Sequence, residues 1–202
     1  SLAIDPAMPD TLYAGSYYGV FKSTDGAASW SAASAGLNSS EVRTLAIDPS
    51  TPSAVYTATE SDGVFKSSDS GASWSAINSG LVATMVYALA MDPLTPSILY
   101  TGTYINGVFK SVDGAESWSA ANTGLNSPYI YSLAVDPTTP TTVYAGTWSS
   151  GVFKSTNSGA SWSPVNTGIA LATVNDLAIA TLTPTTLYAA TMTYGVAKST
   201  NS

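Results

Sequence analysis

Few side chains in this sequence could carry out acid–base, nucleophilic or metal chemistry. The chain has no cysteine and no histidine, which excludes thiol nucleophiles, cysteine-based zinc sites, the Ser–His–Asp triad and the common histidine-based metal sites. Six Lys and Arg residues stand against thirteen Asp and Glu, for a net charge of −7. Nucleic acids and anionic membranes bind clustered basic residues, so we expect neither as a partner. No apolar run approaches the ~20 residues of a membrane span, so membrane insertion is not expected.

Four charged residues that have no evident role in forming a turn belong to one part of the chain. They are Glu41, Arg43, Glu60 and Asp62, and Arg43 is the only arginine. Arg43 can form an ordinary exposed ion pair with Glu41 or Glu60, worth under ~1 kcal/mol. Alternatively, the group is a polar anchor for ligand hydroxyls or a weak calcium site. Calcium needs about six to eight oxygen ligands, which two or three acids do not supply without loop carbonyls, so we predict no metal and no cofactor.

Aromatic residues form a second group of candidates, because many lie in segments rich in Ser, Thr and Asn. These residues are Tyr17, Tyr18, Tyr104, Trp148 and Tyr194, with Tyr87, Tyr129 and Tyr131 in similar surroundings. Exposed rings bordered by hydroxyl and amide groups suit sugars, which offer an apolar C–H face and a rim of hydroxyls. They suit protein partners equally well, since Tyr and Trp dominate binding hot spots. Packing over the rim of the fold, with no ligand at all, is the third interpretation.

A repeat of 44 residues determines where these candidates lie. The string GVFK occupies 19–22, 63–66, 107–110 and 151–154, and returns as GVAK at 195–198. The same step separates Trp30, Trp74, Trp118 and Trp162. Self-similarity at a fixed period indicates one supersecondary unit that buries its surface only against its neighbours.

Each unit has the pattern of four short strands. In the second unit they are 44–48, 54–59, 63–68 and 73–77, separated by Pro, Gly, Asp and Ser. Four strands in 44 residues predict an all-β fold, a β-propeller of four-stranded antiparallel blades. We expect a single domain over residues 1–202, with blades at approximately 1–43, 44–87, 88–131, 132–175 and 176–202.

The fifth unit lacks its outer strand, because only its first three strand segments are present. A ring of five blades is the simplest arrangement, and a larger ring built from more repeats is the alternative. The third strand of blade five then becomes an exposed edge, and such edges invite pairing with another chain. A homo-oligomer formed through this edge is therefore a possible assembly.

The segment from Ser67 to Trp74, SSDSGASW, resembles the Asp-box or BNR repeat, Ser-x-Asp-x-Gly-x-Thr-Trp. Further copies lie at 23–30, 111–118 and 155–162, with a cut-off copy at 199–202. Gly comes one position early in the first and third copies, and Asn157 replaces Asp but keeps the side-chain acceptor of an Asx-turn. The resemblance implies a structural hairpin between the third and fourth strands, in which the Asp accepts backbone N–H groups and the Trp packs across the turn. The structural residues are then Asp25, Trp30, Asp69, Trp74, Asp113, Trp118, Asn157 and Trp162.

The two sides of such a disc differ in sequence. Near-constant turns and the box segments belong to one side, whereas the loops between second and third strands and the links between blades vary and belong to the other. Function is expected where the framework permits variation. The predicted ligand-binding residues, all on that side, are Tyr17, Tyr18, Glu41, Arg43, Glu60, Asp62, Tyr104, Trp148 and Tyr194.

The Asp-box resemblance implies that sialidases and xyloglucanases are related enzymes. One arginine cannot form the three-arginine cluster of sialidases. A glycosidase needs two carboxyl groups about 5–5.5 or 6.5–9.5 Å apart across its substrate, and Glu60 and Asp62 share one short loop. We therefore predict no enzymatic activity, and a lectin-like module that binds a glycan or a protein. The resemblance places it in a secreted or cell-surface bacterial protein. The alternative is a structural repeat that forms oligomers or filaments through its open blade, and a glycoside hydrolase fragment is a lesser possibility.

Overall fold

The computed structural model describes residues 1–37, 41–169 and 171–200 of the chain, which are folded into five antiparallel sheets in chain order. Blade one consists of β1 (Leu2–Ile4), β2 (Leu12–Ser16), β3 (Gly19–Ser23) and β4 (Ser31–Ala32). Blade two consists of β5 (Val42–Ile47), β6 (Val55–Thr59), β7 (Gly63–Ser67) and β8 (Ser75–Ala76). Blade three consists of β9 (Val86–Met91), β10 (Leu99–Thr103), β11 (Val108–Ser111) and β12 (Ser119–Ala120). Blade four consists of β13 (Ile130–Val135), β14 (Val143–Thr147), β15 (Val152–Ser155) and β16 (Ser163–Pro164). Blade five consists of β17 (Val174–Ile179), β18 (Leu187–Thr191) and β19 (Gly195–Ser199).

This architecture confirms the five-bladed β-propeller predicted from the repeat, including the missing outer strand of blade five. Strands pair in sequence order within each blade, so the first strand lies innermost and the fourth outermost. The fourth strands are only two residues long, shorter than expected. In the described ranges there is no helix, and thus none of the length and apolarity that a membrane crossing requires.

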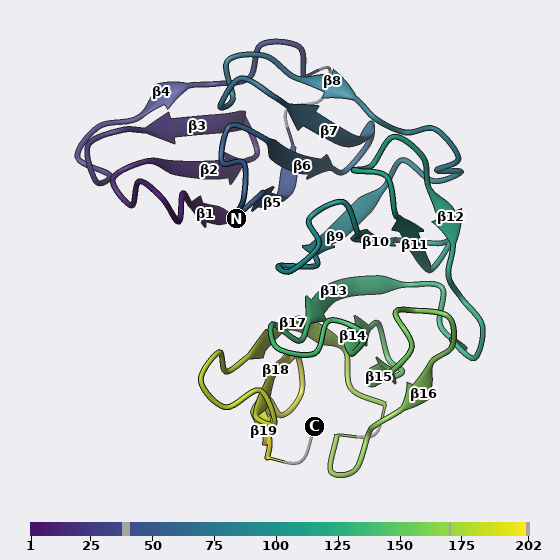
Figure 1. Cartoon of the computed structure of the whole chain (residues 1–202). Helices are drawn as coiled ribbons and strands as arrows, with labels where there is room; N and C mark the ends of the chain where they lie inside the picture. The colour runs from purple at the N-terminus through teal and green to yellow at the C-terminus, as the bar shows by residue number, and fades with distance from the viewer. Residues whose placement is uncertain (38–40, 170, 201–202) are drawn as a thin grey trace.

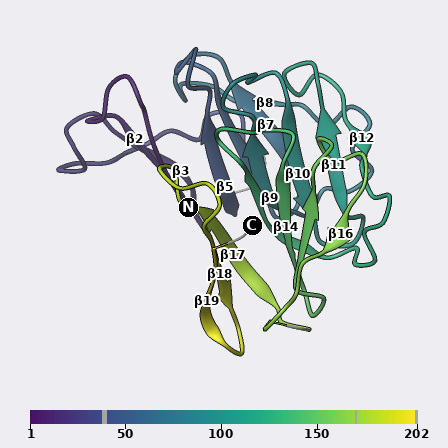
Figure 2. The same cartoon turned by 60° about the horizontal axis from the view of Figure 1, so that its bottom comes forward.

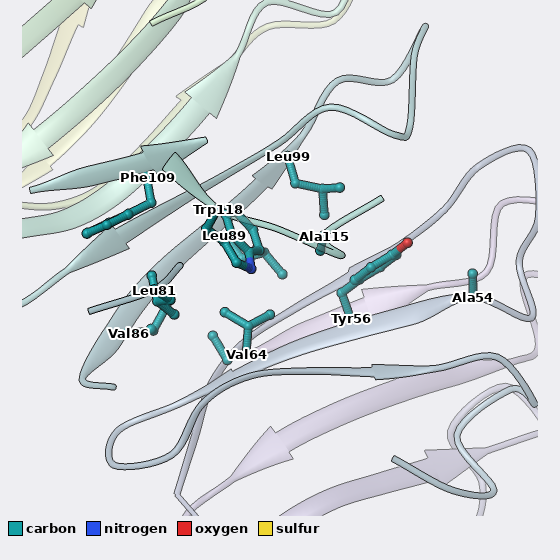
Figure 3. Close-up of a cluster of buried hydrophobic side chains, with 11 residues drawn as sticks. Ala54, Tyr56, Val64, Leu81, Val86, Leu89, Leu99, Phe109, Ala115 and Trp118 are labelled. Carbon is teal, nitrogen blue, oxygen red and sulfur yellow. The ribbon is translucent and has the colours of Figure 1, made fainter. Parts of the chain in front are cut away.

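Hydrophobic residues fill the junctions between successive blades. Four clusters lie at the junctions of blades one and two, two and three, three and four, and four and five. Figure 3 shows the second of these, where Tyr56 and Val64 of blade two meet Leu89 and Trp118 of blade three. The middle strands β6, β10 and β14 are buried at every residue, because a neighbouring blade covers each face of their sheets.

The five blades form an arc, and the described packing does not close it into a ring. Strand packing joins each first strand to the next, from β1 to β5, β9, β13 and β17. None of the core clusters of the described residues joins blade five to blade one. Figure 1 shows the two end blades at opposite ends of this arc, and Figure 2 shows the three strands of blade five extending beside the stack of blades two to four. The closed disc of five blades expected from the repeat is therefore not formed by these contacts.

Hydrogen bonds define the two sides of the arc. On one side, the box hairpin of each blade meets the turn between its first two strands, as Gly114 N donates to Ser97 O at 2.9 Å. On the other, the loop between second and third strands meets the preceding link, as Tyr104 N donates to Met85 O at 3.0 Å. We call these the box side and the loop side.

The box hairpins are closed by their own side chains. In the second copy, Asp69 Oδ1 accepts hydrogen bonds from Ser67 Oγ at 2.7 Å and Ser73 N at 2.8 Å, and Asp69 Oδ2 accepts one from Ser73 Oγ at 2.6 Å. The pKa of Asp25, Asp69 and Asp113 is lowered to about 2. The largest cause in each case is the hydrogen bond from the hydroxyl of the serine that lies four residues later in the chain. Both carboxylate oxygens are thus engaged within the turn.

The box tryptophans differ from the expectation that each packs across its own turn. Trp74 Nε1 donates to Ala33 O of the preceding blade at 2.8 Å, and Trp118 and Trp162 make the same bond one blade further along. Only 3–4% of each of these three residues is exposed. Trp30 packs on no preceding blade among the described residues and is 39% exposed. The tryptophans therefore hold blades together in addition to ending hairpins.

Candidate functional site

Five aromatic side chains on the loop side of blades three and four form one continuous cluster, which we call the aromatic strip. The ring centroids of Tyr87 and Tyr131 are 5.4 Å apart and nearly parallel, at 24°. Tyr104 lies 5.6 Å from Tyr87 and 5.3 Å from Tyr129. Trp148 lies edge-on to Tyr131 at 5.4 Å. Each neighbouring pair is within the range of favourable aromatic contact.

A β-bulge in the first strand of each of blades two to five positions the inner part of the strip. Pairing in blade three shifts between Val86 and Ala88, so Tyr87 has no partner residue on β10. The same shift leaves Arg43, Tyr131 and Asn175 unpaired in blades two, four and five. A bulge redirects the side chain of its extra residue, and the repeat places those residues in a row across successive blades. Tyr87 and Tyr131 are half-buried members of that row.

The loops between second and third strands supply the outer part of the strip. Glu60, Tyr104 and Trp148 occupy equivalent positions, and each donates its backbone N–H to a carbonyl of the preceding link, at 3.0–3.1 Å. For Trp148 the acceptor is Tyr129, which is itself in the strip. Tyr129 and Trp148 are the most accessible members, with 37% and 46% of their surface exposed.

An ion-pair cluster ends the strip on blade two. Arg43, at the bulge, lies over the Tyr87 ring with its guanidinium carbon 4.9 Å from the centroid. The same guanidinium nitrogen pairs with Glu41 at 2.9 Å and with Glu60. Two carboxylates and one guanidinium leave this end with a net negative charge, and its carboxylate oxygens are hydrogen-bond acceptors beside the rings.

Burial raises the pKa of Tyr131, and the neighbouring Tyr104 and Tyr87 raise it further, while Arg43 opposes them. The Tyr131 hydroxyl therefore stays protonated at physiological pH and can both donate and accept hydrogen bonds.

The structure brings together five of the nine predicted ligand residues, namely Glu41, Arg43, Glu60, Tyr104 and Trp148. Tyr17 and Tyr18 lie on blade one and contact each other at 5.6 Å, apart from the strip. Tyr194 is exposed on the equivalent loop of blade five. Asp62 lies in the turn after Glu60, where its N–H bonds Thr59 Oγ1 and its carbonyl accepts from Asn78.

Three residues of the strip, Tyr87, Tyr129 and Tyr131, were not among the predicted ligand-binding residues, although the sequence had indicated them as aromatic candidates. Tyr87 and Tyr131 belong to the strip because the bulge directs their side chains there, and no pattern of residues in the sequence predicts that bulge. Tyr129 reaches it through the backbone bond to Trp148. No cluster of three or more acidic residues able to hold a metal occurs within residues 1–37, 41–169 and 171–200.

Comparison with known proteins identifies the fold. No family and no curated protein sequence matches the chain. A GH74 enzyme from Niastella koreensis has a TM-score of 0.75 at 20% identity, covering 94% of this chain and 32% of that one. The GH74 xyloglucanase from Xanthomonas campestris scores 0.58 at 18% identity, covering 100% and 44%. Chaetomium thermophilum Sqt1, bound to the N-terminus of the ribosomal protein L10, scores 0.74 at 15% identity, covering 98% and 58%.

The chain has the β-propeller fold. At these identities the comparisons establish architecture alone, and the chain spans about a third to three fifths of the length of these propellers. The similar structures include both an enzyme that acts on a glycan and a protein that binds a peptide segment. The fold by itself therefore does not indicate a ligand.

Proposed function

We propose that this β-propeller is a non-catalytic binding module that recognises a glycan on its loop side. The observation that carries the proposal is the aromatic strip, five contacting rings that end on the Arg43 ion-pair cluster. A pyranose ring presents C–H groups on its faces and hydroxyls around its edge. Rings of Trp148 and Tyr129 would stack on those faces, and the phenol and carboxylate oxygens of the site would bond the hydroxyls.

The extended form of the strip favours an oligosaccharide over a single sugar. Its members come from two blades, and its charged end comes from a third, so the contacts follow a line across the loop side. Each stacking contact is shallow and weak by itself. A ligand with several consecutive sugars makes several such contacts at once, which raises its total affinity.

We also propose that the module does not hydrolyse its ligand. Glu41 and Glu60 both pair with one guanidinium nitrogen of Arg43, so they converge on Arg43 instead of facing each other across a substrate, as the two carboxyl groups of a glycosidase do. Asp25, Asp69 and Asp113 are held inside their hairpins, which we assign as structural Asp-boxes. By the same resemblance, we place the protein outside the cell or on its surface.

A peptide is the second candidate ligand. Sqt1, which is similar in fold, binds the N-terminus of a ribosomal protein. The negative charge beside the strip would suit a basic residue next to an aromatic or aliphatic one, since aromatic rings also attract cations.

A glycan array probed with the protein, followed by titration calorimetry on the best ligand, tests the proposal. Trp148→Ala and Tyr104→Ala should each weaken binding by about tenfold or more, because each removes a contact of about 1–2 kcal/mol. Tyr17→Ala is the matched control, since it removes an exposed ring on the same side but outside the strip. Circular dichroism confirms folding of each variant.

Two results would refute the glycan assignment. The first is no binding to any glycan on the array, in which case a peptide library becomes the next probe. The second is an equal loss of affinity in Tyr17→Ala, which would show that the aromatic strip is not the site.

A further inference from the structure

Three of the four internal junctions of the arc, those between blades one and four, join the same two kinds of surface. The junction with blade five differs, because Ala197 stands in place of the phenylalanine and no tryptophan belongs to its cluster. The earlier blade contributes its second-strand tyrosine and the valine of GVFK, here called the tyrosine face. The later blade contributes its first-strand leucine, the phenylalanine of GVFK and the box tryptophan, here called the tryptophan face. Between blades two and three these are Tyr56 and Val64 on one side and Leu89, Phe109 and Trp118 on the other.

Directed hydrogen bonds fix the register of these three junctions. Lys22 Nζ and Tyr13 OH of blade one both donate to Ser70 O, in the box hairpin of blade two, at 2.8 and 2.9 Å. Lys110 Nζ repeats this bond to Ser158 O at 2.9 Å between blades three and four. Each lysine also lies over the ring of its cross-strand tyrosine, at 5.1–5.7 Å from the centroid.

The tyrosine face of blade five is uncovered. Val196 is 72% exposed, whereas its counterpart Val108 in blade three is fully buried. Tyr188 is 37% exposed, whereas Tyr100 is 1% exposed. Lys198 lies over Tyr188 in the arrangement that the internal lysines adopt, at 5.7 Å. This face has the conformation of an occupied junction but no blade against it among the described residues.

The tryptophan face of blade one is uncovered as well. Leu2 is 59% exposed against 8% for Leu89, and Trp30 is 39% exposed against 3% for Trp118. Ile4, beside Leu2, is 53% exposed. The box hairpin that would receive a lysine is intact, because Asp25 Oδ1 accepts from Ser29 N at 2.9 Å and from Ser23 Oγ at 2.8 Å.

We propose that these two faces bind each other between copies, so that blade one of a second copy packs on blade five as a sixth blade. The occupant is a second copy because one chain carries both halves of a junction that the same chain forms three times internally. Lys198 Nζ and Tyr188 OH would donate to the carbonyl of Gly26 in the second copy, the position equivalent to Ser70. Leu2 and Trp30 of that copy would cover Val196 and Tyr188.

Such an interface is head-to-tail, because the two surfaces that meet are different. Heterologous interfaces close into a ring when the rotation permits it and otherwise extend into a filament. The association therefore differs from pairing through the outer edge of β19, which would join two like edges.

Sedimentation velocity of the intact chain and of two single-face variants tests the proposal. The wild type should shift to larger species as its concentration rises. Val196→Glu blocks the tyrosine face and Leu2→Glu blocks the tryptophan face. Both replace exposed side chains, so each variant should fold and remain monomeric alone. An equimolar mixture of the two should form a one-to-one dimer and nothing larger, because each retains the face that the other lacks.

Val112→Glu is the matched control, since it places the same charge on an exposed valine of an internal blade, 65% exposed, and should associate as the wild type does. A wild type that is monomeric at millimolar concentration overturns the proposal. So does loss of association in Val112→Glu, or association by Leu2→Glu alone, which would indicate two like faces. Association that survives both single-face substitutions assigns the contact to the edge of β19 and also overturns it.

Discussion

At the scale of single residues, the box hairpins explain how the repeat tolerates variation in its glycine. Two successive residues have positive φ in each hairpin, for example Gly26 at 69° and Ala27 at 73°, then Ser70 at 57° and Gly71 at 83°. One glycine therefore relieves only one of two left-handed positions, whichever of the two it occupies. The other position holds an L-residue in a conformation that costs about 1–3 kcal/mol.

Ala27→Gly should accordingly stabilise the protein by about 1 kcal/mol, because relief of the left-handed strain exceeds the added entropy of the unfolded chain. Ala28→Gly is the control, since Ala28 is not among the positive-φ residues, and it should destabilise by about 0.4–1 kcal/mol. Urea denaturation of both variants measures the difference. A lower stability for Ala27→Gly would contradict this account of the hairpin.

The box aspartates predict an acid transition. Because the pKa of Asp25, Asp69 and Asp113 is about 2 in the folded protein, below the ordinary 3.8, their stabilisation is present above about pH 4 and is lost as the pH falls toward 2. Asn157 shows that an amide keeps the hairpin, since its Oδ1 accepts from Ser161 N at 2.9 Å.

A triple variant, Asp25→Asn, Asp69→Asn and Asp113→Asn, should therefore fold at neutral pH with a melting temperature that changes less than that of the wild type between pH 4 and pH 2. Circular dichroism melts across this range provide the measurement. Parallel pH profiles for the two proteins would show that the aspartates do not drive the transition.

At the scale of elements, the junction between blades is the unit of stability. Trp118→Ala should destabilise the protein by about 3–5 kcal/mol, because it empties a buried junction and leaves the carbonyl of Ile77 without its donor. Trp30→Ala in the monomer should cost about 1 kcal/mol or less, since in the described part of the chain Trp30 packs on no preceding blade. Urea denaturation at low protein concentration compares them, and equal losses would mean that the junction does not explain the role of the tryptophan.

The same scale accounts for the aromatic strip. The bulge in the first strand of blades two to five adds one unpaired residue at the loop side, and the identity of that residue changes from Arg43 to Tyr87, Tyr131 and Asn175. A constant backbone feature thus presents a variable side chain in each of these four blades.

At the scale of the whole molecule, an arc of repeats has weak ends. Stability in such an array sums over neighbouring units. Blade five has three strands and one packed neighbour, whereas blade three has four strands and two. Amide hydrogen exchange should therefore be faster in β17–β19 than in β9–β11 at concentrations where the protein is monomeric. Uniform protection along the chain would instead indicate a closed, fully cooperative ring.

The sequence alone determined the strand content, the order of the strands and the missing outer strand, because the turn residues and the 44-residue period are local signals that recur. It also separated the constant side from the variable side, and it drew attention to Glu41, Arg43 and Glu60. These predictions depend on short-range patterns of residues along the chain, and such patterns can be read from the sequence without the tertiary structure.

Only the tertiary structure decided which variable residues meet. Tyr87 and Tyr131 are 44 residues apart, and their contact depends on a bulge and on the angle between successive blades. Only the tertiary structure shows that the arc is open, because closure depends on the rotation of each blade relative to the preceding one at the four junctions. These rotations accumulate along the arc, and no local pattern of residues determines their sum.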